Sequence, residues 1–271
     1  MVRRSLLIPL LAAAWLVGCS GTSGPDTLPW YRPAADSSWQ WQLSGPVNTA
    51  YEVDLYDIDL FDTPSSVIDQ LHREGRRVIC YFSAGSYEAW RSDALAFPPE
   101  SLGEEMDGWD ERWIDIRNDG VRTVMLDRLA LAKAKRCDGV EPDNVDGYTN
   151  ETGFPLGADD QLDYNRFLSR EAHRLGLFVG LKNDLDQIPS LEGDFDFALN
   201  EQCHVYDECE KLLPFIEAGK PVFVAEYADK YRDNTDGARD RMCEESRQMG
   251  LHTLVLPLEL DDRFRYSCDQ P

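Results

Sequence analysis

The sequence is poor in histidine and in basic residues, and these shortages exclude some classes of protein. It has 4 histidines, and 27 lysines and arginines against 50 aspartates and glutamates, for a formal charge of −23. A nucleic-acid-binding protein needs a cationic surface, so we expect no nucleic-acid partner. An excess of carboxylates attracts a cationic substrate, but it also keeps an exported protein soluble, and composition alone does not separate these two readings.

Two motifs that carry chemistry in other proteins are missing. There is no Gly-x-Ser-x-Gly sequence, and the histidines fall mostly in predicted helices or at strand starts, which argues against a serine hydrolase. His204 is the exception, because it lies near the candidate site. No two cysteines have Cys-x-x-Cys spacing, which argues against zinc. We therefore expect carboxylate chemistry without a cofactor or metal.

The N-terminus has the pattern of an export signal. Arg3 and Arg4 precede an apolar run, Leu6–Val17, that is too short to cross a bilayer. The run ends in Leu16-Val17-Gly18-Cys19, which resembles a bacterial lipobox; an ordinary secretory signal is the alternative. We predict a lipoprotein signal peptide over 1–18, lipid attachment at Cys19 to a bacterial membrane facing the cell surface or periplasm, and a flexible tether over 19–36.

The other six cysteines fit an exported protein with disulfides. Sequence alone does not choose among their possible pairings. The pair closest in the chain makes the easiest local loop, and it leaves two pairs over longer distances. The expected bridges are Cys203–Cys209, Cys80–Cys137 and Cys243–Cys268.

Beyond the signal, β-rich runs alternate with helical stretches over roughly 250 residues, the usual size of a (β/α)8 barrel. Runs such as Val78–Phe82 are almost continuously apolar, as expected for strands covered on both faces. Residues 121–135 have apolar positions at helical spacing. The eight runs are Tyr51–Asp59, Arg77–Ala84, Arg112–Ile116, Gly139–Asp143, Leu177–Lys182, Phe195–Asn200, Pro221–Glu226 and His252–Leu258. The sequence predicts a single-domain α/β protein, a TIM-type (β/α)8 barrel, over 37–271.

Polar residues gather where these strands end, which is the functional end of such a barrel. The strand ends carry Asp57-Ile58-Asp59, Tyr81–Gly85, Glu141–Asp146, Lys182-Asn183-Asp184, Asn200-Glu201-Gln202, Glu226-Tyr227, and Glu259 with Asp261. A ring of carboxylates, amides and aromatic residues is typical of a carbohydrate site. Hydroxyl-rich substrates need acceptors, and glycosidic cleavage needs two carboxyl groups.

Two of these carboxylates are candidates for catalysis. The alternation of side chains along a strand places Glu141 and Asp143 on one face, and it places Leu199 and Glu201 on one face of another strand. Both sets can point into the barrel mouth, so we predict Asp143 and Glu201 as the catalytic pair. The alternative is a divalent metal held by Asp57, Asp59, Asp143 and Asp146.

Six motifs in order resemble glycoside hydrolase family 114 over nearly the whole chain after the signal. They are Trp39–Gly45, Tyr56–Asp59, Cys80–Gly85, Asp138–Asp146, Leu181–Asn183 and Leu199–Cys203. The resemblance implies an endo-α-1,4-polygalactosaminidase, which cleaves partly deacetylated galactosamine polymers in exopolysaccharide. It places the family's catalytic pair on Asp143 and Glu201. By analogy with retaining α-glycosidases, Asp143 is the nucleophile and Glu201 the acid/base.

The remaining ring residues are expected to bind the sugars around the cleaved bond, with Trp90 or Trp109 as stacking platforms in the loop 89–109. These expected substrate-binding residues are Asp57, Asp59, Tyr81, Asn144, Lys182, Asn183 and Tyr227. The expected partners are a cationic polysaccharide and, through the lipid, a membrane. Two alternatives stay open: a non-catalytic polysaccharide-binding lipoprotein on the same barrel, and a glycosidase for a neutral α-glycan.

Overall fold

The computed structural model of the protein describes residues 30–269. The predicted signal peptide, Cys19 and the first part of the predicted tether therefore lie outside the described residues. Within 30–269, no helix is both long and apolar enough to cross a membrane.

Eight parallel strands form the barrel, in the order β1-β2-β3-β7-β8-β9-β10-β11, and β12 continues the sheet antiparallel to β11. They are β1 Trp39–Gln42, β2 Leu55–Asp59, β3 Arg77–Ser83, β7 Gly139–Asp143, β8 Phe178–Lys182, β9 Phe197–Glu201, β10 Val222–Glu226, β11 His252–Val255 and β12 Tyr266–Ser267. The two ends of the curled sheet meet where Trp39 Nε1 donates to the His252 carbonyl at 3.0 Å. The predicted (β/α)8 fold is confirmed.

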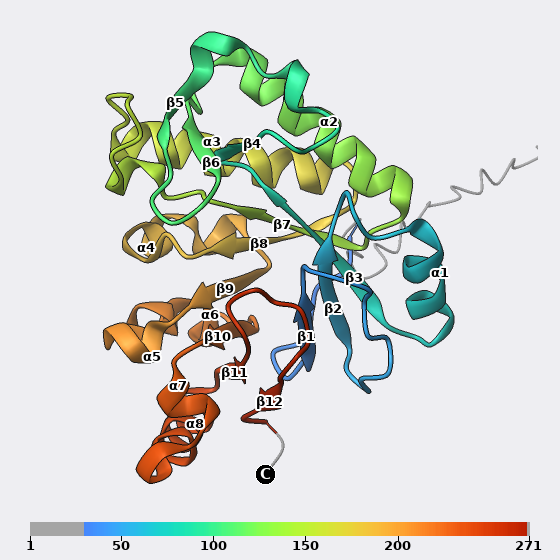
Figure 1. The fold of residues 1–271 in the computed structure, drawn as a ribbon, viewed down its shortest axis with the longest axis vertical. Coiled ribbons are helices and arrows are strands. Elements are labelled where there is room, and N and C mark those ends of the chain that lie inside the picture. Colours follow the sequence, from blue (N-terminus) through green and yellow to red (C-terminus); the bar gives the residue numbers. More distant parts are fainter. Residues whose placement is uncertain (1–29, 270–271) are drawn as a thin grey trace, which may run out of the picture.

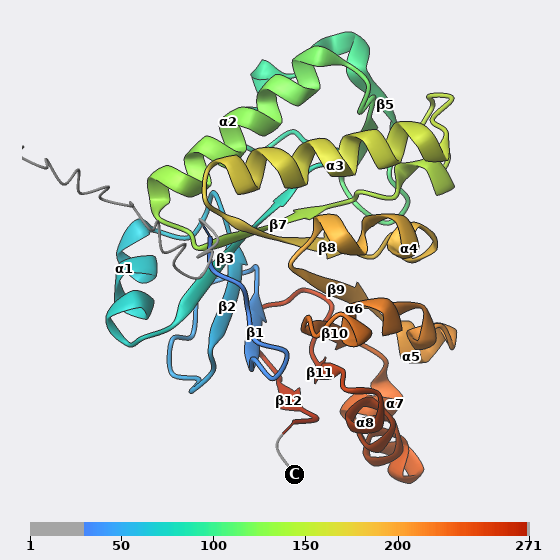
Figure 2. The same cartoon turned by 180° about the vertical axis from the view of Figure 1, so that it is seen from behind.

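Helices cover the outside of the sheet, with the long α2 and α3 side by side and α8 at another edge (Figures 1 and 2). They are α1 Ser65–Arg73, α2 Asp119–Lys135, α3 Ala158–Arg174, α4 Ile188–Leu191, α5 Cys203–Tyr206, α6 Leu213–Glu217, α7 Asp229–Arg232 and α8 Ala238–Met249. Helix α2 begins where the Asn118 side chain accepts from Gly120 N at 2.7 Å, and it buries Val121, Val124 and Leu129 against the strands.

Two strand assignments from the sequence are wrong. The first barrel strand is Trp39–Gln42, which the sequence pattern placed before the barrel. Its polar residues hid it, but they are satisfied internally: Gln42 Nε2 donates to the Ser44 and Pro46 carbonyls at 3.0 and 2.9 Å. Conversely, Arg112–Ile116 contains no barrel strand.

That second segment belongs to a small antiparallel sheet of order β4-β6-β5. Its strands are β4 Ser86–Glu88, β5 Leu102–Glu105 and β6 Glu111–Ile114, and they follow the carboxyl end of β3. A short β-rich run has the same local pattern in either sheet, because only its pairing partners differ. The two errors cancel, so Asp143 still ends the fourth barrel strand and Glu201 the sixth.

The barrel interior has an apolar layer and a polar layer. Trp39, Phe178, Phe197 and Phe223 are buried together in one cluster, near the starts of their strands. Nearer the strand ends, the buried interior is polar, and Lys182 lies within it. The polar layer therefore packs on closely packed aromatic side chains, and this packing limits how far the polar side chains can move.

Three disulfides join the described cysteines, and they are the pairs expected from the sequence. They are Cys80–Cys137, Cys203–Cys209 and Cys243–Cys268. The first links β3 to the segment before β7, the second closes the loop after β9, and the third ties α8 to the C-terminal segment. Cross-links of this kind restrict the unfolded chain and so stabilise the barrel.

Candidate active site

Asp143 and Glu201 approach the same ammonium group at the carboxyl end of the barrel. Lys182, the last residue of β8, places its Nζ 3.0 Å from Asp143 Oδ1 and 3.2 Å from Glu201 Oε2. These two oxygens therefore cannot lie farther apart than the sum of those distances. The structure thus brings together the two carboxylates that the sequence selected as the catalytic pair.

Lys182 is buried, with 1% of its surface exposed. Burial by itself lowers its pKa, but the three neighbouring carboxylates outweigh burial and raise the pKa well above its usual value. The Trp41 ring also lies beneath the ammonium, with its centroid 4.8 Å from Nζ. Lys182 therefore stays charged and bridges Asp143 and Glu201.

Asp143 and Glu201 each accept a hydrogen bond from a tyrosine. The Tyr81 hydroxyl donates to Asp143 Oδ2 at 3.1 Å, and the Tyr227 hydroxyl donates to Glu201 Oε1. Burial, followed by the charge of the neighbouring carboxylate, raises the pKa of both phenols well above the usual value. Both tyrosines therefore keep their hydroxyl protons, and remain hydrogen-bond donors, at the pH values at which carboxyl groups titrate.

The backbone just after the strands completes the arrangement. Asn144 has a φ of 60° and its N–H donates to Asp143 Oδ1 at 2.7 Å. Asn183 has a φ of 48°, and its Oδ1 accepts from Glu201 N at 3.0 Å and from Asn200 Nδ2 at 3.1 Å. Asparagine tolerates this left-handed conformation better than most residues. Asn183 therefore positions the end of β9.

Two more acids lie beneath Asp143 and Glu201. Glu141 is fully buried, and its Oε1 lies 3.2 Å from Lys182 Nζ. Asp57 is 1% exposed, and burial together with the charge of Glu141 raises its pKa well above the usual value. Burial also raises the pKa of Glu141. A proton shared between the two acids avoids a second unpaired charge. The structure thus places Asp57 beneath the site, outside the cavity wall.

A cavity of about 500 Å³ opens above this centre. Its wall includes Trp41, Leu43, Ser44, Asp59, Asp62, Tyr81, Trp90, Arg91, Met106, Trp109, Asp110, Glu111, Asp143, Asn144, Lys182, Glu201, Leu258, Glu259 and Leu260. Trp90 and Trp109 are 54% and 55% exposed, so their rings are accessible for stacking. The loop 89–109 thus lies on the active face, as predicted.

Sequence reasoning missed an ion-pair network in this wall. Arg91 contacts Asp59 Oδ2 at 2.7 Å and Glu88 Oε1 at 2.8 Å, and all three side chains are buried. Asp59 thus faces Arg91, and its Oδ1 also accepts from the N–H groups that follow β2. The sequence around Arg91 does not reveal which of the many acids in the chain will pair with it, so this network could not be predicted.

Glu111 was also missed. It lines the cavity, accepts from the Ser86 hydroxyl, and has a pKa raised to about 7 by burial.

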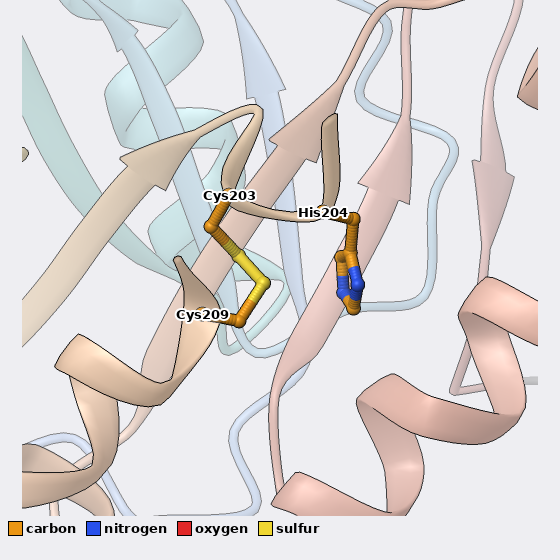
Figure 3. Close-up of side chains that lie close together, drawn as sticks. All are labelled: Cys203, His204 and Cys209. Carbon is orange, nitrogen blue, oxygen red and sulfur yellow. A yellow bond between two sulfur atoms is a disulfide. The ribbon is translucent and has the colours of Figure 1, made fainter. Parts of the chain in front are cut away.

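The contacts of His204 suit a structural role and not metal binding. Figure 3 shows it next to Cys203 and Cys209, the one described group of three residues with metal-ligand spacing. The two sulfurs are bonded to each other, so neither offers a thiolate. His204 Nε2 instead lies 2.8 Å from the Ser246 hydroxyl, and burial lowers its pKa.

Comparisons with known proteins agree with this geometry. The model of glycoside-hydrolase family GH114 matches residues 21–271. The crystal structure of Ega3 from Aspergillus fumigatus in complex with galactosamine is 40% identical in sequence, with a TM-score of 0.83. That match covers 88% of this chain and 97% of that one.

A second structure, the glycoside hydrolase domain of PelA from Pseudomonas aeruginosa, is 17% identical over 84% of this chain and 97% of that one. Its TM-score is 0.64, and at this identity the likeness concerns the fold alone. A search of curated proteins found no significant match. Because the family model covers almost the whole chain, this protein is a glycoside hydrolase that belongs to family GH114.

Proposed function

We propose that the protein is an endo-acting hydrolase of α-1,4-linked, galactosamine-containing exopolysaccharide. The observation that carries the proposal is the pair Asp143 and Glu201, which meet across Lys182 beneath an open cavity. The similarity to Ega3, whose structure contains galactosamine, supports the sugar. A cavity open at the barrel mouth suits a chain that is cut internally.

We assign a retaining mechanism to this pair. Asp143 attacks the anomeric carbon while Glu201 donates a proton to the departing oxygen, and a covalent glycosyl-enzyme forms. Glu201 then takes a proton from water, whose oxygen attacks the same carbon and releases Asp143. Retaining pairs lie about 5–5.5 Å apart and inverting pairs about 6.5–9.5 Å apart. The shared contact with Lys182 favours the shorter separation.

The division of roles rests on the surroundings of each carboxylate. Three donors converge on Asp143, from Asn144 N, Tyr81 and Lys182, an arrangement that suits a nucleophilic carboxylate. The Glu201 side chain is 29% exposed and that of Asp143 16%. The more open position suits the residue that must reach both the leaving oxygen and the incoming water.

The cavity wall favours a cationic sugar. Asp62 and Glu259 have side chains that are 77% and 64% exposed, and Asp110 and Glu111 also line the wall. Asp62 pairs with Arg91 at 3.3 Å and Glu259 pairs with Arg263 at 2.6 Å, but carboxylates still outnumber cations in this wall. A surplus of carboxylates around a cleft attracts ammonium-bearing chains over a Debye length of about 8 Å at physiological salt.

The proposed export and anchoring rest on the N-terminal sequence. We propose cleavage after residue 18 and acylation of Cys19, which tethers the enzyme to a membrane. Cys19→Ser should move the protein from the membrane fraction to the soluble exported fraction. Retention of that variant in the membrane fraction would contradict the lipid anchor.

The test is release of soluble oligosaccharides from partly deacetylated α-1,4-galactosamine polymer. Wild type, Asp143→Asn and Glu201→Gln are compared with Asp127→Asn and Glu210→Gln, which make the same chemical changes at exposed positions outside the cavity. We expect full release by wild type and both controls and essentially none by the two site variants.

The other results separate the alternatives. Binding of the polymer by wild type without any release would indicate a polysaccharide-binding protein. Release that persists unchanged in both site variants would refute the assigned pair. High salt should weaken cleavage of the cationic polymer, whereas activity on a neutral α-glycan with no such salt effect would overturn the sugar assignment. NMR of the first-formed anomer tests retention.

A further inference from the structure

Glu201 also lines a second cavity. It has a volume of about 360 Å³ and is lined by Asp146, Tyr148, Thr149, Asn183, Asp184, Leu185, Asp186, Asn200, Glu201, Tyr206, Glu208 and Lys211. Glu201 is the one residue in the wall of both cavities, whereas Asp143 lines only the first. The two cavities therefore flank the acid/base, and only one of them contains the nucleophile.

This asymmetry gives the two cavities different roles in the proposed reaction. The sugar attacked by Asp143 must occupy the first cavity, because its anomeric carbon has to reach that carboxylate. Glu201 protonates the oxygen that links this sugar to the next one. The next sugar departs with that oxygen, so it lies on the side of Glu201 away from Asp143. The second cavity fits this position, because its wall includes Glu201 but not Asp143.

The wall of the second cavity has more negative than positive charge. Lys211 is its one cationic residue among those described, and its Nζ pairs with Asp186 at 2.9 Å and with Glu208 at 3.5 Å. Asp146 and Asp184 have no cationic partner in the described part of the chain. They are the two carboxylates available to a charged ligand.

Asp184 is 4% exposed, yet only one of its oxygens has a regular hydrogen bond. Oδ2 accepts from Asn165 Nδ2 at 2.8 Å, while Oδ1 has no partner in normal geometry, although the Tyr148 hydroxyl lies close to the carboxyl. Burial and the charge of Asp146 raise the pKa of Asp184 to about 8. Burial also raises the pKa of Asp146 to about 6. Two charges here would be costly without a cation, so Asp184 keeps a proton near neutral pH, and a bound ammonium group would favour the charged form of both acids.

The cation is better identified as an organic ammonium than as a metal ion. Across residues 30–269, the one cluster with metal-ligand spacing is the disulfide-bonded group beside His204, so the acids of this cavity do not converge as ligands do. The volume also admits a sugar ring. Tyr206, which is 65% exposed, offers a stacking surface in the same wall.

We propose that this cavity is the leaving-group subsite and that it selects a sugar with a free 2-ammonium group through Asp146 and Asp184. The inference rests on the proposed function, because it assumes cleavage of a galactosamine polymer. An N-acetylated sugar at this position would bring a neutral, larger substituent and leave both carboxylates without a cation. The enzyme therefore prefers to cut bonds in which the departing sugar is galactosamine.

The acetylation of the products tests this selection. The leaving sugar becomes the new non-reducing end, so partly acetylated polymer is digested and the new non-reducing ends are sequenced by mass spectrometry. We expect wild type to prefer galactosamine over N-acetylgalactosamine there by about tenfold, the factor that corresponds to loss of one charged hydrogen bond. Asp146→Asn and Asp184→Asn should each reduce this preference towards the composition of the polymer.

Asp186→Asn is the matched control, because Asp186 lines the same cavity but is paired with Lys211. It should keep most of the preference. New non-reducing ends that match the polymer composition in the wild-type digest would overturn the subsite, and this result needs no variant to fold. Absence of any cleavage would instead refute the proposed function. A preference unchanged in both Asp146→Asn and Asp184→Asn would reject these two residues as its source.

Discussion

The carboxylates at the two ends of the barrel differ in how many hydrogen-bond and ion-pair partners they have. At the amino end, Asp138 accepts from Val78 N at 2.9 Å and contacts His72 Nε2 at 2.7 Å and Arg77 Nη1 at 2.8 Å. Each oxygen therefore has a partner. At the carboxyl end, by contrast, Asp57, Glu141, Asp143 and Glu201 surround one cation, Lys182.

The amino-end arrangement occurs twice. Asp196, just before β9, accepts from Val179 N at 3.0 Å and from Trp30 Nε1 at 3.0 Å, and it contacts His173 Nε2 at 2.8 Å. Like Asp138, it links a strand start to a histidine near the end of a helix. A carboxylate with this many partners stabilises the fold. Its oxygens are already occupied and are not free to accept hydrogen bonds from a substrate.

The charge of the walls follows the same division. Arg76, Arg77, Lys133 and Arg136 line a cavity at the amino end, where Asp138 is the one carboxylate among the described wall residues. Both cavities at the carboxyl end have mainly acidic walls. The charge is therefore not spread evenly over the barrel: cations dominate the wall at the amino end, and carboxylates dominate the two walls at the carboxyl end.

The largest expected effect is at the cation shared by the carboxyl-end acids. Lys182→Met keeps much of the side-chain volume but leaves several buried carboxylates without a counter-charge. We expect turnover to fall about 100-fold or more and the free energy of unfolding to fall by about 3–5 kcal/mol at neutral pH. Polymer cleavage assays and urea denaturation measure the two effects.

Lys220→Met is the matched control, because Lys220 pairs with Glu192 at the other end of the barrel. It should leave turnover near the wild-type value. Equal losses of turnover in the two variants would remove the distinction between the ends.

A smaller effect, on stability alone, is expected at the amino end. Asp196→Ala leaves the Val179 and Trp30 N–H groups and the His173 ring without their acceptor. We expect a loss of about 3 kcal/mol in the free energy of unfolding, with turnover unchanged at a temperature where the variant is folded. Thermal melting and polymer cleavage check this. A specific loss of turnover in the folded variant would show that the amino end also serves catalysis.

The smallest effect concerns pH at Glu226, which is fully buried at the end of β10. Its Oε1 accepts from His204 N at 2.8 Å, Oε2 has no partner, and burial raises its pKa from 4.5 to about 7. A raised carboxyl pKa means that the folded state keeps a proton that the unfolded state releases. The contribution of Glu226 to stability is therefore complete below about pH 4.5 and is lost as pH rises through about 7.

Glu226→Gln removes this titration. We expect wild type and variant to be equally stable at low pH, and the variant to be more stable by about 2 kcal/mol at about pH 8. Urea unfolding across this pH range measures the difference. A constant difference at every pH would mean that the carboxyl does not change its protonation on unfolding.

Much of the candidate site could be predicted because its signals are local. A strand and its final polar residue are adjacent in the chain, so Asp143 and Glu201 could be placed at strand ends from the alternation alone. The family resemblance, now confirmed, pointed to the same residues. The expected role of Asp57 in substrate binding could not be judged in this way, because burial depends on what covers a residue.

By itself, the sequence determined the (β/α)8 barrel, since parallel βα units leave few other ways to cover both faces of a sheet. Only the tertiary structure decided that Trp39–Gln42 is the first strand, because its polar residues find partners in the folded loop. It also decided that Lys182 is shared by carboxylates from separate strands. Charges far apart in the chain interact strongly only after closure of the barrel brings them together and removes the water between them.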